Sequence, residues 1–553
     1  MLRLHADWTY LEQQFGCSIR DRFLMAVRSL DNPRAVTPFL LERDDRRFGL
    51  FLHVEKGNVQ AAQIPADIVP LYYRPYFTFE ASERPPHVHA TLVDAIASVA
   101  AGDDTVIMDP RAPLVVADEV GTRFKVEVED APEIGSVTLR KVLCADVAAL
   151  LGRGRPSAAA AARRLLDRSP VRDKLSPFLE RHEDRRFVTL DAALQAGGLD
   201  ALIVSSTLNM QEIGGVPVGG KQRPLAVLYQ LGEGVAWVME AGRSAQGQQF
   251  ESPRAALQHV LPFGGSSIGV EIEDIDLGLA RAAGLHDRKR VPADRTIRKW
   301  RDENTLPDLP YYIIATRITR HAIDSALDFA RAGMRRNSPM TEMDPYAVYL
   351  RSMREFAEKA LPGSRVARTL TNFHSSARSI FPANAAPYPV DGDMNALKID
   401  AGCLLFDDAG VLVGCSDIAR TLSTSDDANV IYNLFQSGVR QTLVPGCAAG
   451  RTGEALHADA VRAIWGHRRE LADNPLFVDL REPEREYDRD TGHLLGKNNL
   501  AHLRFVPGEK QMLQEGMIGC CEYQWPVRGY AIAYEDTCLV TSTGGLNLTS
   551  DDA

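Results

Sequence analysis

The chain has 553 residues, of which 45% are hydrophobic and 25% are charged, and its formal net charge is −10 at pH 7. This composition is that of a folded globular protein, and the length suggests three or four domains. The acidic balance argues against a protein that coats nucleic acid or an anionic membrane, so we expect neither partner.

Targeting and redox signals point to the cytoplasm. The segment from Met1 to Asp7 lacks a basic stretch followed by a long apolar core, and no apolar run approaches the roughly 18 residues of a membrane span. The eight cysteines form no CxxC pair, which argues against a zinc ribbon or a thioredoxin-like motif. Cysteines at this density in a large chain are typical of reduced, buried residues in a cytosolic protein.

Two breaks in the pattern divide the chain. The segment 152–157 combines two glycines with a proline, and an alanine-rich helical stretch follows it. A second break lies at 290–310, where prolines interrupt the pattern. We therefore expect domains over 1–150, 180–305 and 311–553.

The first two domains are predicted to be α/β units of similar construction. The segments 94–109 and 255–273 each combine an amphipathic helix, a glycine turn and a short apolar strand that ends in an acidic residue. Further short strands are expected at 201–204 and 225–229. Alternating helices and strands favour α/β units, and the similarity suggests that one domain is a copy of the other.

The last domain has a different pattern. Apolar residues at helical spacing predict a helix over 311–335, and a second helix is expected over 344–361, where Pro362 and Gly363 stop it. Strands are expected around 396–399, 410–413, 517–520 and 538–541. Two helices followed by antiparallel strands indicate an α+β domain.

Five residues of this last domain suggest a metal site. Most of them lie on or beside apolar strand segments, where an acidic side chain is costly to bury unless it is paired or bound to a cation. Four carboxylates and one imidazole can hold two divalent cations close together. The five candidate ligands are Asp400, Asp417, His493, Glu522 and Glu535.

The segments around these residues resemble the motifs of the pita-bread metallohydrolases, which include methionine aminopeptidase, aminopeptidase P, prolidase and creatinase. Here they are Asp-Ala-Gly at 400, Ser-Asp-x-x-Arg-Thr at 416, Gly-His-x-x-Gly at 492, Gly-Met-x-x-x-x-Glu at 516 and Glu-Asp-Thr-x-Leu-Val-Thr at 535. The resemblance implies a pita-bread domain over about 311–550. The segment 185–305 is similar to the creatinase amino-terminal domain, and 1–150 would be a further copy, as in three-domain aminopeptidases P.

The resemblance also implies roles for the five residues. Asp417 and Glu535 would bridge two divalent metals, Asp400 would hold one metal, and His493 with Glu522 would hold the other. In the family, a hydroxide between the metals attacks a carbonyl, and the residue that matches Glu522 handles the proton. The oxygen-rich ligand set favours manganese first, with iron, cobalt or zinc as alternatives.

The residues expected to bind a peptide substrate depart from the family pattern. The interval of 17 residues between Asp400 and Asp417 is longer than in relatives, so Asp407 and Asp408 are expected to be loop acids of a longer hairpin. No histidine follows Asn384, where the peptidases carry one that contacts substrate. Tyr388 and His374 are therefore our candidates for substrate binding.

Three more departures concern catalysis and proline specificity. The second peptidase histidine is displaced to His502, nine positions after His493, and we predict it to be catalytic together with Glu522. Ala533 stands where relatives that cleave before proline often have an arginine. Tyr523 replaces the proline that follows the glutamate of the fourth motif.

Three functions remain open at this stage. The first is a dinuclear hydrolase related to Xaa-Pro aminopeptidase and prolidase, and the second is a metal-dependent enzyme of specialised metabolism acting on C–N, C–S or N–N bonds. The third is a non-catalytic binding module, which would be expected to have lost ligands. The expected partner is a small molecule or a short peptide, and relatives lead us to expect a homodimer.

Overall fold

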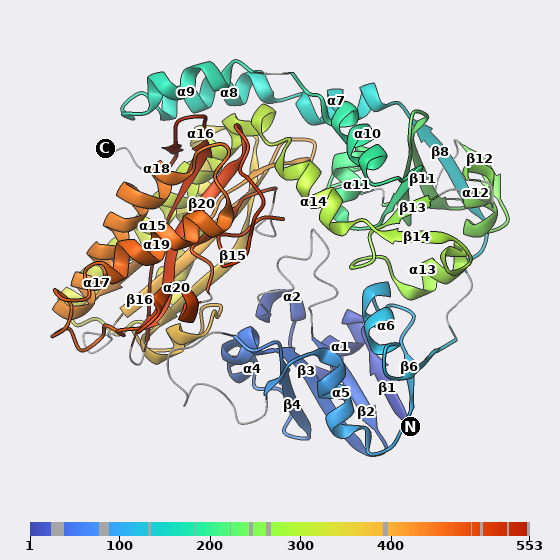
Figure 1. The fold of residues 1–553 in the computed structure, drawn as a ribbon, viewed down its shortest axis with the longest axis horizontal. Coiled ribbons are helices and arrows are strands. Elements are labelled where there is room, and N and C mark those ends of the chain that lie inside the picture. Colours follow the sequence, from blue (N-terminus) through green and yellow to red (C-terminus); the bar gives the residue numbers. More distant parts are fainter. Residues whose placement is uncertain are drawn as a thin grey trace.

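The computed structural model describes residues 1–23, 38–76, 88–130, 134–181, 183–221, 223–242, 247–261, 267–390, 396–487, 489–497, 502–527 and 530–549. The chain forms an amino-terminal region (1–130), a middle region (134–308) and a carboxyl-terminal region (309–549). Figure 1 shows the middle and carboxyl-terminal regions beside one another, with the amino-terminal region below both. No helix in the described ranges is long and apolar enough to cross a membrane.

The amino-terminal region is built on a mixed seven-stranded sheet. The strand order is β5-β4-β3-β2-β1-β6-β7, with β1 antiparallel to β2 and parallel to β6. The strands are β1 (Leu2–His5), β2 (Phe39–Arg43), β3 (Arg46–Leu52), β4 (Ile68–Tyr73), β5 (Val88–His89), β6 (Thr105–Met108) and β7 (Lys125–Val128). The helices are α1 (Trp8–Phe15), α2 (Ile19–Arg22), α4 (Lys56–Ala62), α5 (Leu92–Ala100) and α6 (Leu114–Val120).

The middle region has a second seven-stranded sheet, in the order β12-β8-β11-β10-β9-β13-β14. Its strands are β8 (Val137–Val142), β9 (Ala201–Val204), β10 (Ala226–Gln230), β11 (Gly234–Glu240), β12 (Gln248–Phe250), β13 (Ser267–Val270) and β14 (Lys289–Pro292). The sequence analysis put residues 137–142 in the first domain, whereas β8 pairs with β11 and β12 of the second sheet. The Gly-Pro segment at 152–157 follows this strand and does not separate the two sheets.

The two sheets repeat one topology. In each, five adjacent strands have the same order and the same relative directions: β3-β2-β1-β6-β7 in the first and β11-β10-β9-β13-β14 in the second. The two regions also meet in a reciprocal way, since the amide of Leu114 donates to the carbonyl of Ile275, and the amide of Leu277 donates to that of Ala112, both at 2.9 Å. This pseudo-twofold pairing supports a duplicated origin.

Helices connect and cover the middle region. The covering helices are α10 (Arg186–Ala196), α11 (Thr207–Gly214), α12 (Pro253–Val260), α13 (Leu277–Ala282) and α14 (Asp294–Asp302). Ser206 caps α11 by accepting a hydrogen bond from the amide of Asn209, and Gly215 ends this helix in the left-handed conformation. The connecting helices are α7 (Cys144–Gly152), α8 (Arg155–Leu165) and α9 (Arg172–Leu179), and buried residues of all three join the core around α15.

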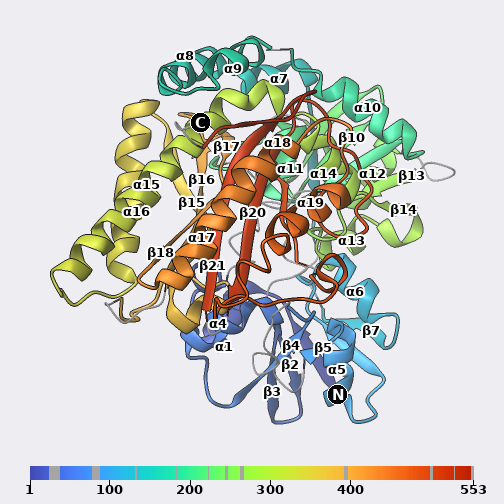
Figure 2. The same ribbon diagram turned by 60° about the vertical axis from the view of Figure 1, so that its left-hand side comes forward.

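The carboxyl-terminal region begins with α15 (Leu309–Arg335) and α16 (Met343–Ala360), which confirms both predicted helices. One sheet contains β15 (Arg365–Ser375), β16 (Ala396–Phe406), β17 (Leu412–Cys415) and β18 (Ile418–Ser423); the other contains β19 (Gly492–Leu494), β20 (Ile518–Val527), β21 (Tyr530–Val540) and β22 (Gly545–Asn547). Figure 2 shows β20 and β21 running toward the amino-terminal region. The remaining helices are α17 (Asp426–Gly438), α18 (Val444–Gly446), α19 (Gly453–Trp465) and α20 (Pro483–Glu486).

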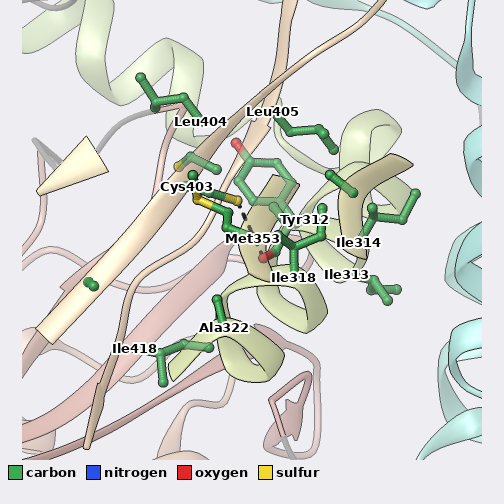
Figure 3. Packing of buried hydrophobic residues seen from close by; sticks show 14 of the residues in the cluster. Tyr312, Ile313, Ile314, Ile318, Ala322, Met353, Cys403, Leu404, Leu405 and Ile418 are labelled. Atoms are coloured by element: carbon green, nitrogen blue, oxygen red, sulfur yellow. Dashed lines mark hydrogen bonds between the residues drawn. The ribbon is translucent and has the colours of Figure 1, made fainter. Parts of the chain in front are cut away.

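The core of this region forms between α15 and the sheet that carries β16. Figure 3 shows Tyr312, Ile314 and Ile318 of α15 packed toward Cys403 and Leu405 of β16. All five side chains are buried. This packing holds the middle of β16 between a helix and its neighbouring strands, and Asp400 lies on that strand.

The cysteines contribute to the cores as thiols. All eight are free, and six of them are buried. Cys447, Cys521 and Cys538 gather in one apolar cluster, where the Sγ atoms of Cys447 and Cys521 are 3.4 Å apart. That separation is well beyond the roughly 2.05 Å of a disulfide bond. The structure therefore agrees with the predicted structural role.

Six buried charges join the middle region to the carboxyl-terminal region. Three cations and three carboxylates form one connected network, with all six side chains between 2% and 12% exposed. Lys497, in the turn after β19, contacts Glu212 at 3.0 Å and Asp308 at 2.9 Å. The other members are Arg155, Asp184 and Arg186.

We predict that Asp308→Asn lowers the free energy of unfolding by about 3–5 kcal/mol, because removing one member of a buried ion pair leaves its partners uncompensated. Urea denaturation followed by circular dichroism measures the change. The matched control is Asp408→Asn, which breaks an exposed pair with Arg153 and should cost less than about 1 kcal/mol. Equal losses in the two variants would contradict a stabilising role for the network.

Candidate metal centre

Three of the five predicted ligands meet where the two sheets of the carboxyl-terminal region face one another. Asp400 lies on β16, Asp417 lies between β17 and β18, and Glu535 lies on β21. Each offers an oxygen within 4.8 Å of an oxygen of each of the others, and all three residues are at most 3% exposed. The structure thus brings together a compact group of buried acids.

A glycine lets two of these acids approach one another. Gly402, two residues after Asp400, lies against the backbone of Ser416, where an added β-carbon would overlap the Ser416 carbonyl oxygen. The Ser416 hydroxyl also accepts a hydrogen bond from the amide of Cys403 at 3.0 Å. The Asp-Ala-Gly motif therefore has a packing reason, since a larger residue would push Asp417 away from Asp400.

An ion pair fixes Glu535 against Asp417. Arg420, from the Ser-Asp-x-x-Arg-Thr motif, donates to Asp536 Oδ1 at 2.6 Å and also to the carbonyl oxygen of Glu535. Thr537 donates its hydroxyl proton to the carbonyl oxygen of Asp417 at 2.9 Å. The polar residues of the two motifs thus bind the ligand-bearing segments to each other.

His493 approaches the same group from β19. Its Nε2 lies 3.7 Å from Asp417 Oδ2, and one of its ring nitrogens lies within 4.8 Å of a Glu535 oxygen and the Cys520 sulfur. Nδ1 lies 2.7 Å from the carbonyl oxygen of Leu494, which favours a proton on Nδ1 and leaves Nε2 as a potential ligand. Gly492 precedes it with φ of +145°, in space that a β-carbon could not occupy.

Glu522 and Asp400 share one hydrogen-bond donor. The side-chain amide of Gln524 donates to Asp400 Oδ2 at 2.7 Å and to Glu522 Oε2 at 3.1 Å. Its carbonyl oxygen accepts from Lys398 Nζ at 3.0 Å and from Arg489 Nη2 at 3.1 Å. The Gln524 side chain therefore separates the carboxylates of Asp400 and Glu522 from the basic groups of Lys398 and Arg489.

Burial and repulsion raise the pKa values of two of the acids, Glu535 and Glu522. Burial raises the pKa of Glu535 well above its usual value, and the neighbouring carboxylates, chiefly Asp417, raise it further. Burial also raises the pKa of Glu522 to about 8, with Asp490 and then Asp400 adding to the shift. Burial lowers the pKa of Lys398 to about 7. Each shift disfavours the charged form of the group.

The donor set fits a divalent metal centre. Both carboxylate oxygens of Glu535 are buried and accept no hydrogen bond of ordinary geometry from the described residues, although the Cys520 thiol offers a weak donor. Buried carboxylates without donors are costly unless a cation compensates them. Asp400, Asp417, Glu535 and His493 can supply ligands directly, and Glu522 is adjacent to Asp400 through Gln524.

His502 lies at the interface between the carboxyl-terminal and middle regions. Its Nδ1 is 2.6 Å from Asp302 Oδ2, and its amide donates to the same oxygen at 3.0 Å. With the side-chain amide of Gln511 oriented to suit its neighbours, that amide donates to Nε2 at 3.2 Å. His502 belongs to none of the close groups of ligand atoms found in the described residues.

The two predicted substrate-binding residues have different surroundings. Tyr388 is 40% exposed, and the guanidinium of Arg378 lies 5.6 Å from its ring centroid. His374 is fully buried on β15 opposite Lys398, and burial lowers its pKa well below the usual range. Neither of its ring nitrogens has a hydrogen-bond partner among the described residues. The structure places His374 beside the Lys398 end of the site and Tyr388 nearer the surface.

The predicted loop acids are where the sequence analysis expected them. Asp407 accepts hydrogen bonds from the amides of Ala409 and Val411 in the turn after β16, and Asp408 pairs with Arg153 at 3.2 Å. The extra residues between Asp400 and Asp417 therefore lengthen this hairpin. Its tip reaches the middle region, where the Gly410 carbonyl accepts from the amide of Gly219 at 2.9 Å.

Lys398, Gln524, Arg489 and Tyr76 were missed as site residues. Strand alternation could have revealed two of them, since Lys398 and Gln524 each lie two residues from a predicted ligand and so share its face of the sheet. Arg489 lies four positions before His493, but no motif points to it. Tyr76 belongs to the amino-terminal region, and only the fold brings it to the site.

Comparison with known proteins places the fold. No protein-family model matches the sequence, and no curated protein matches it. The X-prolyl aminopeptidase from Caenorhabditis elegans, described as a cytosolic enzyme with a di-nuclear active site, matches 93% of this chain and 81% of its own with a TM-score of 0.56. The chain has the fold of the pita-bread metallohydrolases. At 10% sequence identity, this match concerns the fold alone.

Two further pita-bread proteins match a smaller part of the chain. A prolidase from Pyrococcus horikoshii OT3 is 18% identical and matches 66% of this chain and 98% of its own, with a TM-score of 0.47. The dipeptidase PepE from Mycobacterium ulcerans is 19% identical and matches 66% and 95%, with a TM-score of 0.49. The predicted fold class, α+β with a carboxyl-terminal pita-bread domain, is confirmed.

We predict that the affinity of the metal-free protein for Mn²⁺ rises with pH. Below about pH 8 the raised pKa keeps Glu522 protonated, and the raised pKa of Glu535 favours its protonated form too, so a metal must displace these protons. The dissociation constant should fall about tenfold per pH unit for each displaced proton between about pH 6 and 7.5. Calorimetric titration measures it, and an affinity independent of pH would contradict the protonation of these ligands.

The same shifts predict how the metal-free protein responds to pH. A carboxyl group whose folded pKa is raised binds its proton more tightly in the folded state, so stability falls as pH rises from about 4.5 to about 8. Mn²⁺ should remove this loss at the upper end of the range. Melting temperatures measured with and without the metal test this expectation.

We also predict that Gln524→Met weakens Mn²⁺ binding about 10–100-fold, because residues that orient ligands typically contribute that much. The substitution removes the amide that separates the cations from Asp400 and Glu522. The exposed Gln249→Met, on β12, is the control and should bind as the unmodified protein does. Unchanged affinity in Gln524→Met would show that the amide has no positioning role.

Proposed function

We propose that the protein is a dinuclear metal-dependent hydrolase of amide bonds, related in activity to Xaa-Pro aminopeptidase and prolidase. The observation that carries this proposal is the group of three buried acids, Asp400, Asp417 and Glu535, within 4.8 Å of one another. A protein without metal chemistry gains nothing from burying three repelling carboxylates. The pita-bread fold supports the same conclusion, since the X-prolyl aminopeptidase with that fold is described as having a di-nuclear active site.

The predicted ligands and Gln524 would have different roles in this reaction. Asp400, Asp417, His493, Glu522 and Glu535 would hold the two cations. Bound cations would supply Lewis acidity and a water that ionises near neutral pH. Glu522 would hold and return a proton at its carboxylate, and Gln524 keeps that carboxylate oriented by donating to Oε2.

The catalytic assignment of His502 stays a prediction. Its contacts with Asp302 and Gln511 occupy both ring nitrogens within the protein. They fix the proton on Nδ1, because Asp302 accepts there. To act on a substrate, His502 Nε2 would have to give up its hydrogen bond with Gln511 and form one with the substrate amide.

We further propose manganese as the resident metal, with iron, cobalt or zinc as alternatives, and a homodimer located in the cytoplasm. A short peptide or a small amide is the proposed substrate, with no nucleic-acid or membrane partner. The complete ligand set disfavours a non-catalytic binding module. The basic side chains of Lys398 and Arg489 beside the ligands favour, as the second candidate, an enzyme of specialised metabolism acting on a polar small molecule.

We predict that Asp417→Ala and Glu535→Ala each lose bound metal and activity together, because each removes a predicted metal ligand from the buried group. Elemental analysis after reconstitution with Mn²⁺ or Fe²⁺ measures the metal, and turnover of Xaa-Pro dipeptides and tripeptides measures activity. Asp408→Ala, in the exposed tip of the same hairpin, is the control and should keep both. Full metal content and rate in either ligand variant would refute the assignment.

Less than about one equivalent of metal in the reconstituted unmodified protein would refute both metal-dependent functions. A fully metallated protein that cleaves no Xaa-Pro peptide would favour the second candidate.

A further inference from the structure

Three buried thiols meet in the apolar cluster that packs against β20 and β21. Cys521 lies on β20, Cys538 lies on β21, and Cys447 follows α18. Their sulfur atoms all lie within 4.8 Å of one another, and none of the three residues is exposed. Because side chains alternate along a strand, Cys521 points to the opposite side of β20 from Glu522. The three thiols are therefore separate from the carboxylate centre, although they share its strands.

The spacing of the sulfur atoms suits ligands of a single ion. Cys521 Sγ lies 3.4 Å from Cys447 Sγ and 3.9 Å from Cys538 Sγ. A cation that bonds thiolates at about 2.3 Å holds them about 4.0 Å apart in a trigonal arrangement and about 3.8 Å apart in a tetrahedral one. The two measured separations lie close to these values, so the cluster could close around an ion with little movement.

The hydrogen bonds of these thiols differ from those of other buried cysteines. Cys415 donates to the carbonyl oxygen of Gly496 at 3.0 Å, and Cys403 donates to that of Ala315 at 3.5 Å. Within the described ranges, the three clustered thiols have only one another as hydrogen-bond partners. Sulfur is a weak donor and a weak acceptor, so these contacts satisfy the thiols poorly. Cysteines that only fill a core pack as small hydrophobic residues and have no need to contact one another.

An irregular helix brings Cys447 to the two strands. After α17 the chain forms a π-helical segment (Val439–Leu443), which continues into α18. The amide of Cys447 donates to the carbonyl oxygens of Leu443 and Val444, both at 3.1 Å. A π-helical turn is rare and occurs frequently at functional sites. The backbone thus holds Cys447 in place beside the thiols of β20 and β21.

The surroundings favour a soft ion with few ligands. Thiolates select Cu(I), Zn²⁺ and iron–sulfur clusters over the hard cations that suit carboxylates. A structural Zn²⁺ site almost always has four protein ligands, whereas the described residues offer three sulfurs here and no fourth histidine, cysteine or carboxylate. Leu443 and Leu456 belong to the same apolar cluster, which provides no polar ligand. Cu(I) has a filled d shell and accepts three thiolates in a plane.

We propose that Cys447, Cys521 and Cys538 bind one Cu(I) ion, in a site that is independent of the hydrolase function proposed above. Each bond to copper replaces the S–H bond of a thiol, the proton passes to solvent, and neither copper nor sulfur changes its oxidation state. The ion links the segment after α18 to β20 and β21. It therefore stabilises, from the opposite face, the two strands that carry Glu522 and Glu535.

The first test measures binding of Cu(I). Protein whose carboxylate centre is loaded with Mn²⁺ is titrated with Cu(I) under anaerobic conditions, in competition with the chelator bicinchoninate, and one tightly bound equivalent is expected. Cys447→Ala and Cys538→Ala should each weaken binding by more than the roughly 10–100-fold typical of residues outside the ligand shell. Cys403→Ala removes an equally buried thiol from the other sheet and is the matched control, which should bind as the unmodified protein does.

Because the cluster is closed, copper is also supplied during expression, and elemental analysis measures the copper in the purified protein. Absence of copper by both routes would overturn the proposal, and so would equal affinity in Cys447→Ala and the unmodified protein. A disulfide between Cys447 and Cys521 in place of bound copper would also overturn it, and mass spectrometry without reduction detects such a bond. Melting curves and manganese content establish that each variant is folded.

The second test needs no variant. X-ray absorption at the copper edge should show three sulfur ligands, and a shell of nitrogen or oxygen would overturn the site. Cu(I) should raise the melting temperature of the unmodified protein and leave that of Cys447→Ala unchanged, because a ligand stabilises only the form that binds it. Binding of Zn²⁺ that depends on these cysteines, without binding of Cu(I), would overturn the choice of copper. Peptide turnover tests the hydrolase function separately, since the copper site stands whether or not any peptide is cleaved.

Discussion

Repulsion among buried carboxylates is the constraint on which the carboxyl-terminal region depends. Asp400, Asp417 and Glu535 lie together in a buried group, and both aspartates destabilise the charge on Glu535. The surrounding polar contacts resist their separation: Arg420 binds the strand of Glu535 to β18, and Gly402 lets β16 lie against Ser416. The clustered carboxylates would therefore be stabilised by positive charge, which bound metal would supply.

The same constraint explains why two neighbouring cations do not neutralise the acids directly. Gln524 lies between them, with its amide nitrogen toward Asp400 and Glu522 and its oxygen toward Lys398 and Arg489. An amide can do this because its two ends differ in hydrogen-bonding character. The arrangement leaves the acids available to metal.

Much of the carboxyl-terminal fold could be predicted from the sequence, because the ligand motifs and the periodicity of α15 and α16 are local. The longer hairpin after Asp400 was also predictable from its turn residues. The membership of β8 in the second sheet was not, since pairing across residues 142–235 depends on long-range contacts. Tyr76 and Arg489 were missed for the same reason: more than 400 positions separate them, and only docking of the amino-terminal region brings them together.

The network around Lys497 has a consequence for how the molecule unfolds. Its six charges come from the connecting helices, the middle region and the turn that follows His493. If one region unfolds, the charged side chains of the other lose their ion-pair partners. The middle and carboxyl-terminal regions should consequently melt in a single transition. Loss of the metal-binding turn and loss of the neighbouring sheet would then be one event, and proteolysis would find no stable half-molecule between them.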